Sequence, residues 1–231
     1  MDNTWFNSPL LGLVLTFFTY KIGERLVEKL NLNFLPPLLT SCALIIFLIT
    51  FTGLFTYEQY ALGGTMINFL LGPATIALAL PLVRNFSVLV KHYKILFIGV
   101  LTGTLSGVIS IIFFARLFGA SEQVMFSLVP KSVTTPIAME IASTLGGIPP
   151  LTAACVICTG IFGAMCGHKI LAAIGVKNDI SIGLALGASS HALGVSSCIP
   201  ISALQVAIGS LAIALVGIAT AIFAPPLVNL L

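Results

Sequence analysis

The chain is a succession of long apolar segments separated by short stretches that carry charges, glycines or prolines. Eight segments can be delimited, at about residues 5–20, 35–55, 61–83, 95–117, 122–145, 149–171, 180–199 and 203–231. Most of them reach the roughly 20 residues that a helix needs to cross a bilayer. They lack the alternating polarity of transmembrane β-strands. The pattern predicts an all-α polytopic membrane protein with a single transmembrane domain over residues 1–231.

Composition indicates a chain that lies in lipid rather than in water. Hydrophobic residues make up 58% of the sequence and charged residues 7%, whereas a soluble domain carries about 25% charged residues. The lysines and arginines are dispersed between apolar segments, so the net charge of +3 does not indicate a nucleic-acid partner. Basic residues follow the first apolar segment instead of preceding it, which is the reverse of a signal peptide and predicts a retained helix.

No pattern in the sequence indicates catalysis, a metal or a cofactor. The five cysteines all lie in or beside apolar segments, as Cys42, Cys155, Cys158, Cys166 and Cys198. We interpret them as small core residues, because redox or zinc chemistry needs a polar, accessible setting. The adjacency of Ser189 and His191 in sequence is not evidence of a catalytic pair. We therefore expect a protein that is not an enzyme and that holds no metal and no cofactor.

Segment 122–145 is the least apolar one and contains a lysine at membrane depth. Two prolines, Pro130 and Pro136, flank Lys131 and a run of hydroxyl side chains. A charged residue inside a membrane segment is costly and usually marks a pathway or a site. Non-helical backbone at that depth must be buried in protein or line a watery cavity. The stretch between the prolines is predicted to be such a break.

This break predicts an anion-binding site. Thr135 followed by Pro136 is typical of a helix N-cap with proline at the first helical position. The free amides and the positive end of the helix dipole would then point at the break, where Lys131 sits. Ser132, Thr134 and Thr135 would supply further hydrogen-bond donors. The alternative is that Lys131 reaches the membrane surface from a loop.

The segment at 180–199 has a similar pattern. Ser189, Ser190 and His191 lie between Gly187 and Gly194, so that glycines permit a turn and hydroxyls can bind. His191 is either a titratable group that couples proton movement to transport, or a structural histidine that is hydrogen-bonded across helices.

Two other positions have open roles. Glu140 lies about two turns after Pro136, and it pairs with Lys131, carries protons or faces an aqueous rim. Gly72 and Pro73 interrupt segment 61–83 and resemble an apolar counterpart of the Lys131 break.

A spacing of 57 residues relates the interrupted segments to one another. Gly72–Pro73 recurs as Val129–Pro130 and Leu186–Gly187, and Thr102–Gly103 recurs as Thr159–Gly160 and Val216–Gly217. Each unit is an interrupted segment followed by a smooth one, an arrangement in which transporters place their binding sites. Chance matches in a glycine-rich sequence are the alternative.

Counting crossings gives the topology. Basic loops face the cytoplasm, so residues 21–29, 84–94 and 168–177 should share a side. The last two lie on one side only if one of the three intervening segments does not cross, and 122–145 is the polar one. We expect about six spanning helices and two opposed re-entrant segments, 122–145 and 180–199, in a repeat-containing, transporter-like core. A pair of crossing broken helices is the alternative.

Several motifs resemble the LrgB/CidB family of bacterial membrane proteins. They are residues 128–138 (LVPKSVTTPIA), 146–149 (GGIP), 167–168 (GH), 190–194 (SHALG) and the earlier block 71–82. The resemblance spans essentially the whole chain, and the block around Lys131 is its most specific part.

The resemblance implies two functions, both in the bacterial cytoplasmic (inner) membrane. One is transport of small monocarboxylates such as pyruvate or glycolate. The site predicted from the two breaks would then bind the substrate, through Lys131, Ser132, Thr134, Thr135, Ser189, Ser190 and His191. The other is holin/antiholin-type modulation of murein hydrolase activity and autolysis. Either implies a small LrgA/CidA-like membrane partner, and a homo-oligomer is a further expectation. The carrier is the leading hypothesis, because a cation and a helix N-terminus meet at a membrane break.

Overall fold

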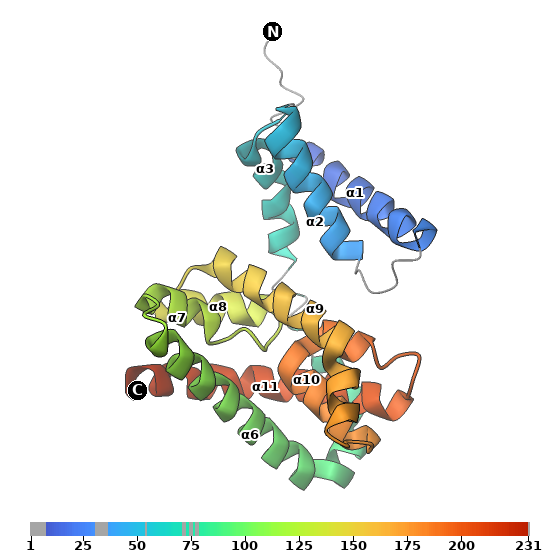
Figure 1. The fold of residues 1–231 in the computed structure, drawn as a ribbon, viewed down its shortest axis with the longest axis vertical. Coiled ribbons are helices and arrows are strands. Elements are labelled where there is room, and N and C mark those ends of the chain that lie inside the picture. The colour runs from blue at the N-terminus through green and yellow to red at the C-terminus, as the bar shows by residue number, and fades with distance from the viewer. Residues whose placement is uncertain are drawn as a thin grey trace. The chain divides into compact units, whose positions relative to one another are not determined.

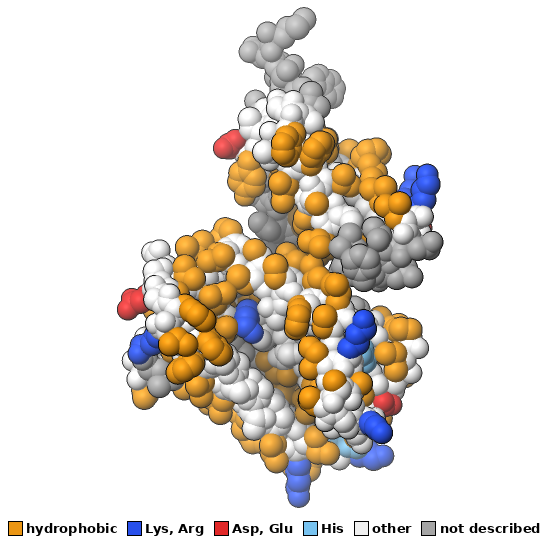
Figure 2. All heavy atoms as spheres, in the orientation of Figure 1, with side chains coloured by type: hydrophobic (Ala, Val, Ile, Leu, Met, Phe, Trp, Pro, Cys, Tyr) orange, Lys and Arg blue, Asp and Glu red, His pale blue; other side chains and the backbone are white. Residues whose placement is uncertain are grey.

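The computed structural model describes residues 8–30, 37–53, 55–70, 73, 76 and 79–230 of the chain. Every regular element among these residues is a helix, which confirms the all-α class. The chain forms two compact units, Met1–Ala74 and Thr75–Leu231 (Figure 1). Hydrophobic side chains cover much of the visible face of each unit, and charged ones are few (Figure 2).

The described residues of the first unit form three α-helices and one π-helical turn. They are α1 (Pro9–Lys29), α2 (Pro37–Phe47), η1 (Leu48–Thr52) and α3 (Tyr57–Phe69). Helix α1 packs against both α2 and α3. Gly12 and Gly63 let the backbones of α1 and α3 touch, and the hydroxyls of Thr19 and Ser41 lie 3.0 Å apart between α1 and α2.

One stretch of this unit that was predicted to be a loop is helical. The basic stretch 21–29 forms the last turns of α1, where Lys21 Nζ and Glu24 Oε2 pair at 2.6 Å across one turn. Residues 57–60 form the first turn of α3. The reason is a capping box: the backbone N–H of Thr56 donates to Gln59 Oε1 at 2.9 Å, and that of Gln59 to Thr56 Oγ1 at 3.4 Å.

The second unit holds seven described helices. They are α5 (Ala79–Arg84), α6 (Phe86–Leu117), α7 (Glu122–Leu128), α8 (Thr135–Leu145), α9 (Pro149–Ala173), α10 (Asp179–Ser196) and α11 (Ala203–Leu230). Helices α6, α9 and α11 are long and apolar enough to cross a membrane, so the chain is a membrane protein. The predicted loops 84–94 and 168–177 lie largely within helices, because α6 and α9 continue beyond their apolar cores.

The long helices α6 and α11 run in the same direction (Figure 1). Residues 96–100 of α6 share one core cluster with residues 208–219 of α11, and residues 108–115 share another with residues 224–228. Helix α9 runs the opposite way, from the end of α6 back towards its beginning (Figure 1). The basic beginning of α6 and the basic end of α9 therefore lie at the same end of this unit, as the sequence predicts.

Helices α7 and α8 form a short hairpin at the other end. The chain leaves the helical conformation at residues 129–134 and returns, so that the backbone N–H of Ile148 donates to Ser127 Oγ at 2.7 Å. Thr134 is the N-cap of α8, and Pro136 occupies its second position. The predicted cap at Thr135 is thus wrong by one residue, and the Thr134 side chain makes no capping hydrogen bond.

Helix α10 is a second hairpin, folded at His191. That residue has φ 43° and ψ −141°, whereas the helix continues on either side. The second half lies against the first, since a Cβ on Gly194 would be 2.6 Å from Ser190 Cβ. Gly187 and Gly194, which were predicted to form the break, are both helical and serve close packing. Gly187 faces the backbone of Gly209 in α11.

Polar contacts join the open end of the α10 hairpin to α11 and α9. Asp179 accepts hydrogen bonds from Ser202 Oγ at 2.7 Å and from Gln205 Nε2 at 2.8 Å. Cys198 Sγ lies 3.7 Å from His168 Nε2 at the end of α9. The two hairpins therefore enter this unit from opposite ends.

Part of the predicted topology falls on residues outside the described ranges. Gly72 is outside the described residues, and Pro73 is described only as helical and exposed. Within the described part of the chain three helices meet the length and composition of a span, and α2 with η1 forms a shorter apolar stretch. The six-span count stays a prediction.

Candidate functional site

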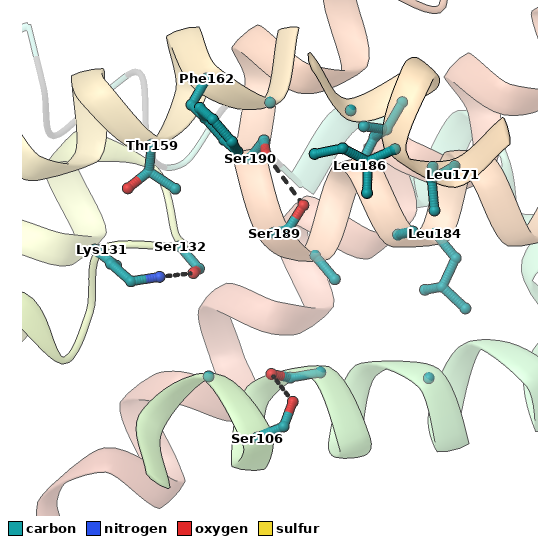
Figure 3. A pocket seen from close by; sticks show the side chains of 18 of the residues that line it. Ser106, Lys131, Ser132, Thr159, Phe162, Leu171, Leu184, Leu186, Ser189 and Ser190 are labelled. Atoms are coloured by element: carbon teal, nitrogen blue, oxygen red, sulfur yellow. Dashed lines mark hydrogen bonds between the residues drawn. The ribbon is translucent and has the colours of Figure 1, made fainter. Parts of the chain in front are cut away.

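A cavity of about 860 Å³ lies between α6, α9, α10 and the loop that joins α7 to α8 (Figure 3). Its polar side chains are one lysine and seven hydroxyls: Thr102, Ser106, Ser110, Lys131, Ser132, Thr159, Ser189 and Ser190. The remaining wall is made of glycines and apolar side chains. The tips of the two hairpins thus meet at one polar cavity among apolar helices.

Lys131 supplies the positive charge of the cavity. It projects from the non-helical loop, is half-buried, and donates from Nζ to Ser132 Oγ at 3.4 Å. Within the described ranges the single ion pair joins Lys21 and Glu24, so no described carboxylate neutralises Lys131. Glu140 is exposed and does not form the ion pair with Lys131 that was one of its three proposed roles.

Ser189 and Ser190 come from the tip of the α10 hairpin. Their Oγ atoms lie 3.0 Å apart, and Figure 3 shows them across the cavity from Lys131 and Ser132. Ser190 is buried because it occupies the space that Gly163 of α9 leaves open. Four residues that the sequence predicted for the site are therefore brought together.

Three other predicted site residues do not line the cavity. Thr134 is buried, and its Oγ1 has no hydrogen-bond partner among the described residues. Thr135 begins α8. His191 points away, with Nε2 2.9 Å from the carbonyl oxygen of Val156 in α9. Since a carbonyl oxygen can only accept, this nitrogen carries the proton and donates.

The structure adds a row of hydroxyls on α6 that sequence reasoning missed. Thr102, Ser106 and Ser110 recur every fourth residue and face the cavity, and each donates to a carbonyl of its own helix at 2.8, 3.2 and 2.9 Å. Their oxygen atoms keep lone pairs for a ligand. The i, i+4 spacing of these hydroxyl residues was the available signal. Beside this row, Gly107 has open space in front of it.

The arrangement suits a small anion with a single negative charge. One ammonium group provides charge, and Ser132 and the Ser189–Ser190 pair provide hydroxyl donors. Thr159 donates to the carbonyl oxygen of Cys155 in its own helix, and the apolar wall accommodates a short carbon chain. A serine nucleophile would need a base beside it. The nearest histidine in sequence, His191, instead donates a hydrogen bond from Nε2 to the carbonyl oxygen of Val156.

Comparison with known proteins shows one family. The model of the LrgB-like family matches residues 16–230. "Antiholin-like protein LrgB" of Bacillus cereus (strain B4264) is 36% identical over 220 residues, which cover 94% of this chain and 95% of the relative. "Uncharacterized protein YxaC" of Bacillus subtilis (strain 168) is 37% identical over 216 residues, 94% of each chain. No solved structure matches significantly.

Proposed function

This chain belongs to the LrgB-like family, and we propose that it acts as an antiholin-like modulator of murein hydrolase activity and autolysis. The observation that carries this proposal is the near full-length similarity to relatives named antiholin-like. The three long apolar helices agree with a multi-pass protein of the bacterial cytoplasmic membrane. A small LrgA/CidA-like membrane protein is its proposed partner.

Autolysis of a bacterial strain that lacks its own LrgB-like gene tests this function. Expression of the chain, alone and with the small partner, should slow detergent-induced lysis and lower the murein hydrolase activity of the culture. A lysis rate equal to that of the empty-vector strain in both pairings would refute the proposal. Immunoblots of membrane fractions control for expression.

The geometry of the cavity supports a second candidate function, movement of a small monocarboxylate across the membrane. The observation that carries it is Lys131, which has no described carboxylate within ion-pair distance and shares its cavity with hydroxyls from both hairpins. An unpaired cation in an apolar surrounding is unfavourable, and a bound carboxylate would neutralise it. Pyruvate and glycolate have the required charge and size.

We propose a membrane arrangement that suits the transport function. Helices α7 and α8 have 7 and 11 residues and rise about 10 Å and about 16 Å, which is less than the roughly 30 Å of a hydrocarbon core. The α7–α8 and α10 hairpins would therefore be re-entrant, entering from opposite faces, within a six-span protein. Alternating exposure of a site between opposed interrupted helices is a known transporter mechanism.

Uptake of labelled pyruvate into liposomes tests the carrier. Liposomes with the purified chain, with and without the small partner, should take up pyruvate, and Lys131→Met should reduce uptake at least tenfold because a charged hydrogen bond contributes about 1.5–3 kcal/mol. Lys131→Arg keeps the charge and is the matched control. Absence of uptake in every pairing would refute the carrier, and an autolysis effect that survives Lys131→Met would favour the antiholin-like function alone.

A further inference from the structure

His191 holds a backbone conformation that side chains rarely adopt. Among the described residues it is the only non-glycine residue with positive φ, at 43°, and 5% of its surface is exposed. Such a conformation is unfavourable and persists only where the surroundings enforce it. Glycines lie nearby at positions 187 and 194, yet the fold-back falls on the histidine.

Two residues of α9 contact the imidazole of His191. The carbonyl oxygen of Val156 accepts a hydrogen bond from His191 Nε2 at 2.9 Å. One turn later, Gly160 faces the imidazole ring, and a Cβ at that position would lie 2.5 Å from Cε1 and 2.7 Å from Nε2. The ring thus occupies a notch on α9 that exists because residue 160 is glycine. We call Val156 and Gly160 the α9 notch.

The fold-back determines what α10 presents to the cavity. Ser189 and Ser190 are the last residues before it, and both line the cavity, whereas His191 does not. Ser190 is seated against Gly163, one turn beyond the notch on α9. The hydrogen bond from His191 to Val156 and the packing of Ser190 against Gly163 therefore both hold residues 189–191 of α10 against one face of α9.

We propose that His191 is a positioning residue: seated in the α9 notch, it fixes the point at which α10 folds back and so holds Ser189 and Ser190 in the cavity. The inference rests on the second candidate function, in which these hydroxyls contact the bound anion. It assigns His191 a role other than anion ligand or proton carrier, and it gives a specific purpose to the other reading that the sequence left open, a structural histidine hydrogen-bonded across helices.

Substitutions on either side of the notch test the proposal with the full-length chain in detergent micelles and pyruvate as the probe. Gly160→Ala places a methyl group where the imidazole lies, and His191→Gly permits the same φ without the imidazole. Each should weaken pyruvate binding about tenfold, the effect of losing one or two neutral hydrogen bonds. Gly64→Ala, with no atom within 4 Å of the added Cβ, is the matched control and should bind as the wild type does.

Double substitutions distinguish positioning from direct contact. If His191 acts through the serines, Ser190→Ala should weaken binding in the wild-type background and have no further effect in the His191→Gly background. Gly160→Ala should likewise add nothing once the imidazole is absent. Additive effects in both pairs would show that His191 contacts the anion itself and would overturn the proposal. His191→Asn, which tolerates positive φ and keeps an N–H donor, should bind more tightly than His191→Gly.

Hydrogen exchange tests the fold-back independently of any ligand. Amides of residues 187–194 should exchange faster in Gly160→Ala and His191→Gly than in the wild type or Gly64→Ala, because the notch no longer holds the tip. Unchanged exchange in both variants would overturn the proposal. If the wild type binds no pyruvate, the carrier function fails while the exchange comparison still decides whether His191 fixes the tip.

Discussion

Ser127 closes the α7–α8 hairpin, and its removal should destabilise the second unit. Its side chain is completely buried, accepts from the backbone N–H of Ile148 at 2.7 Å and donates to the carbonyl oxygen of Gln123 at 2.6 Å. In Ser127→Ala the N–H of Ile148 has no acceptor, and lipid cannot provide one. An unsatisfied buried donor costs about 1–3 kcal/mol. We expect a loss of about 2 kcal/mol in the free energy of unfolding.

Equilibrium unfolding in mixed micelles measures this loss. A difference of about 2 kcal/mol corresponds to a roughly thirtyfold shift in the ratio of folded to unfolded protein. Ser196→Ala is the matched control, because Ser196 is exposed and its hydroxyl donates only to Leu193 in the preceding turn of its own helix; it should change stability by less than about 0.5 kcal/mol. Equal effects of the two substitutions would refute the assigned role of Ser127.

Three further predictions concern α6 and the open end of the α10 hairpin. Hydrogen bonds from Gln205 and Ser202 lower the pKa of Asp179 below its ordinary 3.8, so the ionised carboxylate stabilises the fold above that pH. Asp179→Asn should therefore lower the free energy of unfolding at pH 7. In unfolding curves recorded over a pH series, this difference from the wild type should vanish as the pH falls through the lowered pKa. Gly183→Ala puts a Cβ 2.9 Å from Gln205 Cα and should cost about 1–3 kcal/mol in the same assay. The leucine side chain of Gly107→Leu enters open space and should leave the unfolding midpoint unchanged. It should reduce pyruvate uptake, because it occupies the cavity. Unchanged uptake would contradict the proposal that pyruvate passes through this cavity.

Sequence patterns predicted the interrupted segments well because their signals are local. The apolar segment 122–145 coincides with α7, the break and α8, since proline and a lysine at membrane depth leave few alternatives to a break. The spacing of 57 residues also has a structural counterpart. In the second unit each hairpin is followed by one long smooth helix, α9 after α7–α8 and α11 after α10.

The point at which α10 folds back depends on a distant contact and could not be predicted. Local preference favours Gly187 or Gly194, because glycine adopts positive φ without strain. The structure places the break at His191, where Gly160 and Val156 of α9 receive the ring. These partners lie 31 and 35 positions earlier in the sequence, and no local pattern of α10 indicates them.

The missing members of the site have a similar explanation. Thr102, Ser106 and Ser110 look like ordinary small residues of a membrane helix, and each bonds to its own backbone. Only the packing of α6 beside α10 turns their common face into a cavity wall. Conversely, Thr134 and Thr135 were assigned to the site from the helix-cap pattern, yet they do not line the cavity.

The shortness of α7 and α8 has a consequence for how this protein is made. Neither helix can be inserted across the bilayer on its own, and α8 packs chiefly against α9, which emerges from the ribosome later. The α10 hairpin likewise packs most extensively against α11, which is synthesised after it and is the most buried of the three long helices. Both hairpin tips can therefore reach their final packing only after the helices that follow them have been synthesised. A nascent chain that stops before residue 203 would lack the helix against which the α10 hairpin packs most extensively.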